Sequence, residues 1–311
     1  MNRLRRTWIL VWAVAATLLF LVSIAWPDAT QMAVRSLSPL VKTTPALAQT
    51  SESPVQLEWL GWQFFRLTSP RGKIVFFNPA LNDPRAAFKN SDSPLNLDDI
   101  TAADLVVATS GHADDQGMTV DIAKKTGAMV VTTFELANWM VGQGVASDKI
   151  LRAEPGSRFD VDGIKVQVVN SVHGSRAPPL PGQAAAVYGG PALGFIVTLE
   201  NGVKVYHAGS TALTQDLQLY GRLYTPHVAL LPIGSGMFPE EAAMAAEFLR
   251  TDNPNLHSVF PQHYAASSPA ERQGDVFVKA VQARRGLQGV KPFAPKPGQA
   301  FLITTGGTRP R

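Results

Sequence analysis

The 311-residue chain contains no cysteine. Disulfide bonds and thiolate ligands are therefore excluded, and any metal ion must be bound by histidine, aspartate, glutamate or water. Charged residues are also scarce, at 17% of the chain, where globular proteins average about a quarter. Hydrophobic residues make up 45%, so the composition is typical of a folded globular protein rather than a disordered one.

A concentrated run of positive charge is missing from most of the sequence. The net charge of +4 comes in part from Arg3, Arg5 and Arg6, which precede every acidic residue, and the other basic residues are scattered among acids. Nucleic-acid binding requires basic residues gathered on one face or stripe. We therefore expect no nucleic-acid partner, and the charge pattern disfavours a nuclease.

The N-terminus holds a long segment without charge. Residues 8–26 read WILVWAVAATLLFLVSIAW, follow the basic MNRLRR and precede Pro27 and Asp28. Such a segment is long enough to span a bilayer as a helix, and its basic flank favours the cytoplasmic side. The pattern predicts a signal anchor over residues 1–27, attached to the membrane through residues 8–26. The rest of the chain would then lie in the periplasm or outside the cell.

A cleaved signal peptide is the alternative to an anchor, with cleavage near Ala25 or near Ala48. Either outcome exports the remainder of the chain. Residues 28–54 are rich in serine, threonine, proline and alanine, a composition typical of a linker. We therefore expect one folded domain over residues 55–311.

Strand and helix patterns alternate along this domain. Three short aromatic and β-branched segments, at residues 55–60, 63–67 and 73–77, predict an antiparallel meander at a sheet edge. Further strands are predicted at residues 104–109, 129–132, 165–169, 194–199, 203–208, 228–232, 259–260 and 300–304. Helices are predicted at residues 119–126, 134–141, 214–223, 239–249 and 269–284. The pattern indicates an α/β fold in which helices cover two packed sheets, a four-layer αββα sandwich.

Five polar clusters each follow a predicted buried strand. They read SGHADD at residues 110–115, SVHGS at 171–175, YHAGST at 206–211, PIGS at 232–235 and PQHY at 261–264. A loop at the end of a buried strand is held rigidly and is still exposed, so these clusters are candidates for a functional site.

The clusters and their flanking segments resemble one protein family. The flanks read DIAKKTGA at residues 121–128, FELAN at 134–138 and VALLPIG at 228–234. Together they resemble the metallo-β-lactamase superfamily, in particular its ascorbate-phosphate-lactonase-like branch of metal-dependent hydrolases. The resemblance covers nearly all of residues 55–305 and implies an αββα fold, with a metal site where strand ends from both halves meet.

The metal-binding motif departs from the family pattern. Where the family has H-x-H-x-D-H, the chain has Ser110 in place of the first histidine and Asp115 in place of the last. The aspartate that bridges two ions in the family's A-G-D-T loop is Ser210 here. The family's G-H-S reads GWQ at residues 61–63, its D-P reads NP at 78–79, and its P-I-G-D ends in serine.

The remaining ligand positions of the family are kept as His112, Asp114, His173 and His263. The resemblance implies that these residues bind a metal ion. Asp115 has no counterpart in the family pattern, and we expect either Asp114 or Asp115 to complete the ligand set with the three histidines and either of the two to act as the catalytic base. Three imidazoles and one carboxylate suffice for one zinc ion, whereas the lost bridging carboxylate argues against two. The ordinary alternatives are a hydrogen-bonded loop histidine and, for Asp114, a helix N-cap.

Two functions follow from this motif. The first is hydrolysis of a small ester, lactone or phosphoester by a metal-activated water, with at most one zinc ion. The second is a catalytically inactive binding or scaffolding protein that keeps the fold.

Other residues near the motif have lesser expected roles. His207 should support the site without binding metal, and His227 and His257 should be surface or packing residues. The proline-rich segment 178–182 either covers the pocket or forms a rigid surface turn.

Overall fold

The computed structural model describes residues 53–180 and 182–311. The predicted signal anchor at residues 1–27, and the predicted linker at residues 28–54 except its last two residues, lie outside this part of the chain. Among the described residues, no helix is both long and apolar enough to cross a bilayer.

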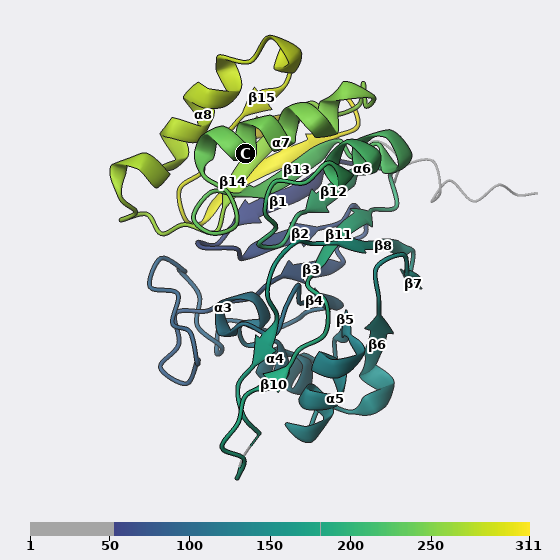
Figure 1. Ribbon diagram of the computed structural model, residues 1–311. Coiled ribbons are helices and arrows are strands. Elements are labelled where there is room, and N and C mark those ends of the chain that lie inside the picture. The colour runs from purple at the N-terminus through teal and green to yellow at the C-terminus, as the bar shows by residue number, and fades with distance from the viewer. Residues whose placement is uncertain (1–52, 181) are drawn as a thin grey trace, which may run out of the picture. The chain divides into compact units, whose positions relative to one another are not determined.

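Two large β-sheets form the centre of the fold (Figure 1). The first has eight strands, in the order β17-β16-β1-β2-β3-β4-β5-β6. Its strands are β1 (Val55–Trp59), β2 (Phe65–Thr68), β3 (Ile74–Phe77), β4 (Leu105–Val107), β5 (Met129–Thr133), β6 (Ile150–Ala153), β16 (Gln299–Thr304) and β17 (Gly307–Pro310). The strands from β3 to β6 run parallel, and the others pair antiparallel.

The second sheet has seven strands, in the order β15-β14-β13-β12-β11-β8-β7. Its strands are β7 (Arg158–Val161), β8 (Ile164–Asn170), β11 (Leu193–Thr198), β12 (Lys204–His207), β13 (Val228–Pro232), β14 (Ser258–Gln262) and β15 (Lys291–Pro292). The strands from β12 to β15 run parallel. A separate two-stranded ribbon joins β9 (Arg176–Ala177) to β10 (Val187–Tyr188).

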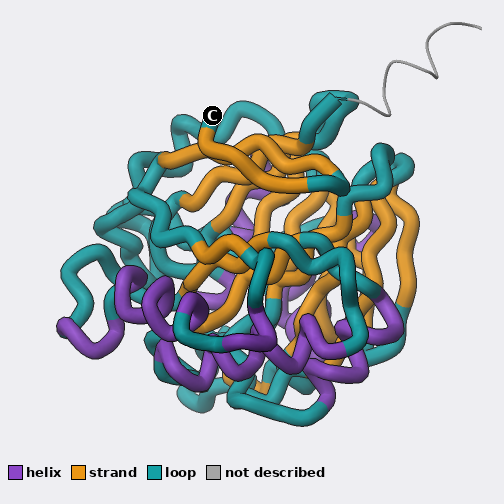
Figure 2. The backbone as a smooth tube through the Cα atoms, turned by 90° about the horizontal axis from the view of Figure 1, so that it is seen from above, coloured by secondary structure: helices purple, strands orange, loops and turns teal. Residues whose placement is uncertain are grey.

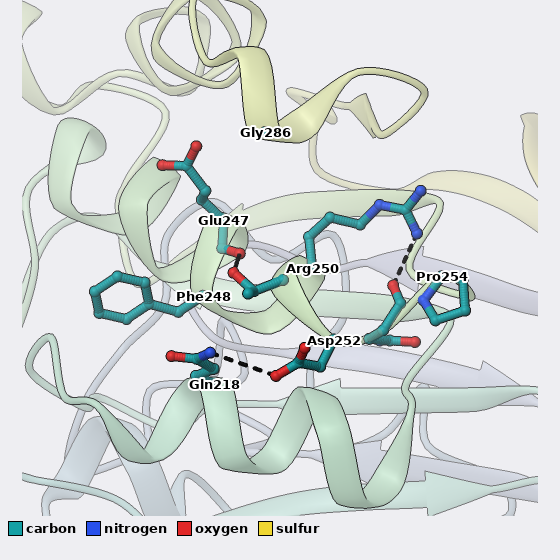
Figure 3. A pocket seen from close by; sticks show the side chains of 9 residues that line it. Gln218, Glu247, Phe248, Arg250, Asp252, Pro254 and Gly286 are labelled. Carbon is teal, nitrogen blue, oxygen red and sulfur yellow. Dashed lines mark hydrogen bonds between the residues drawn. The ribbon is translucent and has the colours of Figure 1, made fainter.

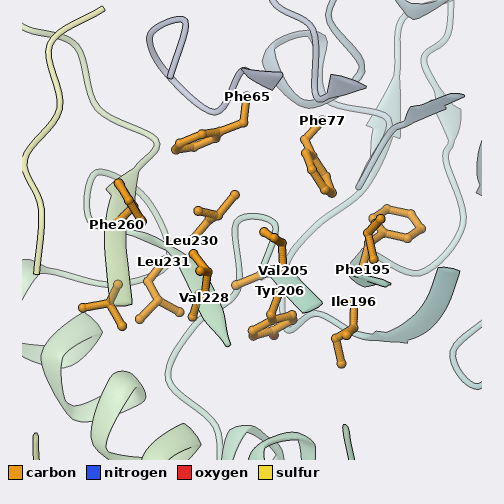
Figure 4. Packing of buried hydrophobic residues seen from close by; sticks show 14 of the residues in the cluster. Phe65, Phe77, Phe195, Ile196, Val205, Tyr206, Val228, Leu230, Leu231 and Phe260 are labelled. Atoms are coloured by element: carbon orange, nitrogen blue, oxygen red, sulfur yellow. The ribbon is translucent and has the colours of Figure 1, made fainter. Parts of the chain in front are cut away.

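The two sheets pack on each other through apolar side chains. Figure 4 shows Phe65 and Phe77 of the first sheet facing Val205, Leu230 and Phe195 of the second. All five side chains are fully buried. Because successive side chains of a strand point to opposite faces, the neighbours of these residues on the second sheet face away from the first.

Helices cover the outer faces of both sheets. The helices are α3 (Ala113–Gln116), α4 (Thr119–Thr126), α5 (Phe134–Gly142), α6 (Asp216–Tyr224), α7 (Pro239–Thr251) and α8 (Gly274–Gln282), with 3-10 turns η2 (Ser147–Lys149), η3 (Ala270–Arg272) and η4 (Arg285–Leu287). α4 and α5 pack on the first sheet, and α6, α7 and α8 pack on the second. In Figure 2 the strands run side by side and the helices lie beside them. The layers therefore follow the predicted order helix, sheet, sheet, helix.

Local sequence signals set the limits of several helices. α4 ends at Gly127, whose φ of 74° is left-handed and suits glycine. α7 begins with Pro239 at its first position, and Glu241 accepts a hydrogen bond from the backbone N–H of Phe238 at 2.8 Å. Both helices start where the sequence predicts.

Two expectations about the elements are wrong. The meander β1-β2-β3 is antiparallel as predicted, but it lies inside the sheet because β16 and β17 extend the sheet beyond β1. The helix predicted at residues 269–284 is interrupted, since Gln273 is extended, with φ −83° and ψ 154°. A 3-10 turn precedes that residue, and α8 follows it.

Candidate metal centre

All the predicted site residues follow the carboxyl end of a strand. The loop after β4 carries His112, which is extended and precedes α3, and it places Asp114 and Asp115 in the first turn of that helix. His173 follows β8 in the second sheet, and His263 follows β14. Loops from both sheets therefore meet at one edge of the sandwich.

His112, His173 and Asp115 form a cluster that could hold one metal ion. One ligand atom from each residue lies within 4.8 Å of the others. The two imidazole rings have centroids 5.0 Å apart and are nearly perpendicular, and His112 Nδ1 is 3.9 Å from Asp115 Oδ2. Ligands about 2.1 Å from a tetrahedral zinc ion lie about 3.4 Å from one another. The side chains of the cluster would therefore have to move closer by about an ångström to bind one ion.

Asp114 and His263 contact each other directly. His263 Nε2 lies 3.0 Å from Asp114 Oδ2, and the indole N–H of Trp62 donates to the same oxygen at 3.0 Å. The Trp62 ring also packs edge-on against His263, with centroids 5.3 Å apart. Of the predicted ligands, the structure thus brings His112 and His173 into one group and pairs Asp114 with His263.

Burial and hydrogen bonding determine the charge states of these groups. Burial raises the pKa of Asp114, but the hydrogen bond and charge of His263 and the hydrogen bond from Trp62 outweigh it and lower the pKa to about 2. Burial lowers the pKa of His173, and the charge of Asp115 opposes the shift only in part. At neutral pH Asp114 is therefore ionised and His173 is neutral, the forms in which both can bind a metal.

Asp115 is the centre of a buried hydrogen-bond network. Its side chain is 1% exposed. The hydroxyl of Ser110 and the amide of Gln63 donate to its carboxylate, Ser210 Oγ donates at 2.9 Å, and Asn78 Nδ2 lies 3.4 Å away. A buried carboxylate without partners is strongly destabilising, and these neutral donors supply its partners without any ion.

Every member of this network stands at a position where the chain departs from the motif that the sequence resemblance implies. By that resemblance, Ser110 and Asp115 stand in place of two histidines, and Ser210 stands in place of the bridging aspartate. Gln63 and Asn78 come from the two smaller departures near the N-terminus of the domain. Asn78 Nδ2 also donates to Gln63 Oε1 at 3.0 Å. The residues at these positions are therefore joined in a single hydrogen-bond network.

His207 contacts the backbone of Gln63, a member of this network, and is not part of the cluster of possible metal ligands. Its Nδ1 accepts a hydrogen bond from the backbone N–H of Gly209 at 3.2 Å, so its Nε2–H donates to the carbonyl oxygen of Gln63, also at 3.2 Å. The ring stacks on Phe77, with centroids 5.1 Å apart. Burial lowers its pKa to about 4, so the ring is neutral at pH 7.

Three residues of the site have left-handed backbone conformations. They are Trp62 with φ 55°, Asn78 with φ 44° and His263 with φ 63°. Such conformations are unfavourable for residues other than glycine and are concentrated at functional sites. In the sequence, Trp62, Gln63 and Asn78 stand out only as departures from the motif, and they were not predicted to be site residues. Because they occupy positions of the family's metal loops, their place in the motif could have identified them.

A cavity opens beside the cluster. It has a volume of about 630 Å³ and is lined by His112, Arg176 and several alanine and proline residues, among them Pro178 and Pro179. Of the segment 178–182, Pro178 and Pro179 therefore form part of the wall of a pocket next to the site.

A second cavity, of about 790 Å³, is lined by residues of α6 and α7, by the loop after α7 and by Gly286 (Figure 3). Its polar side chains bond to neighbouring groups: Gln218 donates to Asp252 at 3.4 Å, and Arg250 donates to the carbonyl oxygen of Asn253 at 2.8 Å. It contains no histidine, so the cavity beside His112 is the better candidate for a substrate site.

The fold and the site together define a class of protein. Two packed sheets covered by helices, with histidine and aspartate side chains on strand-end loops, are the arrangement that the sequence resemblance predicted for the metallo-β-lactamase superfamily. Comparison with known families confirms that class. A model described as the beta-lactamase superfamily domain matches residues 73–253, and the chain belongs to this family.

Similar proteins are named as metal-dependent hydrolases. A UPF0173 metal-dependent hydrolase of Rubrobacter xylanophilus is 37% identical over 211 residues, which cover 67% of this chain and 81% of that protein. One of Methanopyrus kandleri is 35% identical over 250 residues, covering 79% and 99%. These comparisons do not distinguish the ascorbate-phosphate-lactonase-like branch, which stays a prediction.

Solved structures show the same fold. The structure of Igni18, described as a metallo hydrolase from Ignicoccus hospitalis, matches with a TM-score of 0.65 and 26% identity, covering 81% of this chain and 99% of that chain. An isothiocyanate hydrolase from Delia radicum gut bacteria matches with a TM-score of 0.56 and 17% identity, covering 80% and 99%, a likeness of fold alone.

Proposed function

We propose that the protein is a hydrolase that uses a single divalent metal ion bound by His112, His173 and Asp115. We expect this ion to be zinc. The observation that supports this proposal is the approach of one ligand atom from each of these residues to within 4.8 Å. Two imidazoles and a carboxylate form a donor set that zinc accepts, and they leave a further coordination position open.

Each residue of the site has a separate role in the proposed hydrolysis. A bound zinc ion would lower the pKa of its water to about 7 and so provide a nucleophile. Asp114 is ionised and 21% exposed, so it can orient water and accept its proton. His263 and Trp62 hold this carboxylate in place. The water oxygen would join the acyl carbon or phosphorus, the bond to the leaving oxygen would break, and that oxygen would take up a proton.

The predicted ligands Asp114 and His263 have a different role in this proposal. Because they bond to each other at 3.0 Å, we place them beside the ion and not around it. The substrate would be a small ester, lactone or phosphoester that enters through the cavity next to His112.

An inactive binding protein is the second candidate. The observation that favours it is the Asp115 network, which satisfies a buried carboxylate with neutral donors alone. In that case the cavity would bind a small ligand without hydrolysing it, and a metal ion would be unnecessary.

The deciding experiment combines an activity panel with a single substitution. We expect the zinc-supplied protein to hydrolyse at least one of a set of nitrophenyl esters, lactones and phosphodiesters. His173→Ala should abolish both the activity and the metal content. His257→Ala, which removes a histidine far from the cluster, is the matched control and should change neither. A zinc-supplied protein that contains no metal and hydrolyses none of these compounds would favour the inactive binding protein.

A further inference from the structure

The cavity beside His112 is lined mainly by small apolar residues. Apart from His112 and Arg176, its wall consists of alanine and proline residues such as Ala113, Ala177 and Pro178. Among the described residues that line it, Arg176 alone carries a permanent charge. The cavity therefore offers a potential metal ligand, a small apolar surface and a single cation.

The backbone fixes Arg176 next to the loop that carries His112. Arg176 lies in β9, and Ala177 beside it is 1% exposed. A Cβ atom on Gly111 would lie only 2.7 Å from the backbone nitrogen of Ala177, so the two segments touch. The backbone N–H of Gly111 also donates to Ser175 Oγ at 3.0 Å. Gly111 therefore contacts both Ala177 and Ser175, the two neighbours of Arg176 in the chain. These contacts fix the backbone of Arg176 beside the loop that carries His112.

The pocket wall beyond Arg176 is also anchored. The indole N–H of Trp139 in α5 donates to the carbonyl oxygen of Pro178 at 2.8 Å. β9 pairs with β10, which places Tyr188 opposite Arg176. These contacts hold the wall in place without using the guanidinium group.

Arg176 is exposed, and its guanidinium group has no ionic partner in the part of the chain that the structure describes. It shares this feature with other exposed arginines such as Arg222, but it lines the cavity beside His112. A guanidinium group presents several N–H donors in a planar arrangement that fits carboxylate and phosphate oxygens. Its position at the pocket leaves these donors available to a ligand.

We propose that Arg176 binds an anionic group of the substrate, at the end opposite the bond that is cleaved. The alanine and proline wall would contact the uncharged middle of the molecule, and the reacting group would lie toward His112. The substrate class is then a small ester with an apolar body and a distal carboxylate. This inference rests on the proposed hydrolase function for the reaction, but the binding of the anion does not require it.

Two esters that differ in one charge test the proposal. The first is 4-nitrophenyl butyrate, and the second is the mono-4-nitrophenyl ester of glutaric acid, which has the same leaving group and a distal carboxylate. We expect Arg176→Met to raise KM for the glutarate ester about tenfold, since a charge-assisted hydrogen bond is lost. KM for the butyrate ester should change less than twofold. Arg176→Lys should restore part of the affinity, and Arg222→Met, an exposed arginine on α6, should behave as the unaltered protein.

A binding measurement separates failure of this inference from failure of the proposed hydrolase. Calorimetry with monomethyl glutarate and with the neutral dimethyl ester needs no turnover. If no ester is hydrolysed but the monoanion binds and Arg176→Met abolishes binding, the anion site stands and the hydrolase does not. If the glutarate ester is hydrolysed with the same KM by the unaltered protein and by Arg176→Met, the anion site is wrong and the hydrolase stands. Absence of monoanion binding in the unaltered protein also overturns the anion site.

Discussion

Asp115 shows how a carboxylate, at a position where the family resemblance implies a histidine, can be buried in a stable fold. A histidine at this position is uncharged when it binds metal, whereas Asp115 brings a negative charge into a site that is 1% exposed. The cost of burying that charge is offset by Ser110, Ser210 and Gln63, which all donate to it. Replacing one of these donors by an apolar residue would leave the carboxylate short of partners, with a cost of about 1–3 kcal/mol.

His207 gives the protein a pH-dependent stability. Its folded-state pKa is about 4, below the ordinary value of 6.5. The unfolded chain therefore takes up a proton on this group below about pH 6.5, while the folded chain does so only near pH 4, and stability falls as the pH drops through that window. The shift corresponds to on the order of 3 kcal/mol. His227, with a pKa lowered to about 4 by burial first and by nearby positive charges second, acts in the same direction.

We predict that His207→Gln weakens the dependence of stability on pH. Glutamine keeps a donor for the Gln63 carbonyl oxygen but cannot be protonated. The measurement is urea unfolding at pH 7 and at pH 4.5, and the loss of stability between the two should be smaller in the variant than in the unaltered protein. An equal loss in both would show that His207 does not control this window.

At the scale of elements, the backbones of α6 and α7 approach each other so closely at Gly221 that no side chain would fit between them. A Cβ atom on Gly221 would lie 2.2 Å from the carbonyl oxygen of Leu249. Both residues are fully buried in the described fold, and α6 and α7 cover the second sheet together. The glycine therefore permits a backbone-to-backbone contact that fixes the separation of the two helices.

Gly221→Ala should destabilise the domain in spite of the better helix propensity of alanine. The gain in propensity is about 1 kcal/mol, whereas forcing two packed helices apart costs about 1–3 kcal/mol or more. With a backbone atom as the obstacle, we expect a net loss of about 2 kcal/mol in the free energy of unfolding. Gly307→Ala, at a strand position with open space around it, is the control and should change stability by less than 0.5 kcal/mol, roughly. A Gly221→Ala variant as stable as this control would contradict the close contact.

Sequence patterns predicted those elements whose apolar residues have a clear period. The bounds of β13 and α4 match the prediction because one is a wholly buried strand and the other an amphipathic helix that ends at glycine. β7 was missed because its residues alternate between exposed and half-buried, without an apolar face. The two-residue strands β9 and β10 carry no periodic signal at all.

The candidate site was predictable only in part, for a similar reason. His112 and His173 stand in motif positions, so the family pattern identifies them. That Asp115 would replace Asp114 in the group with these histidines depends on how the first turn of α3 is oriented, which no motif specifies. The hydrogen bonds from Gln63 and Asn78 to Asp115 join residues 52 and 37 positions apart, and only the folded structure reveals them.

At the scale of the whole molecule, the location of the protein stays a prediction from the N-terminal sequence. The uncharged residues 8–26 after a basic start predict that the folded domain lies in the periplasm or outside the cell. A reporter fused after Arg311 that functions only outside the cytoplasm, such as alkaline phosphatase, should be active. Activity confined to a reporter that functions only in the cytoplasm would contradict this topology.

The central claim is that the chain binds at most one metal ion, because Ser110, Asp115 and Ser210 stand where the family resemblance implies two histidines and a bridging aspartate. Its most direct test is the metal content of purified protein after equilibration with zinc and removal of free ions. We predict at most one zinc ion per chain in the unaltered protein. The triple variant Ser110→His, Asp115→His and Ser210→Asp, which restores two imidazoles and the bridging carboxylate, should approach two. Two tightly bound ions in the unaltered protein would contradict the claim.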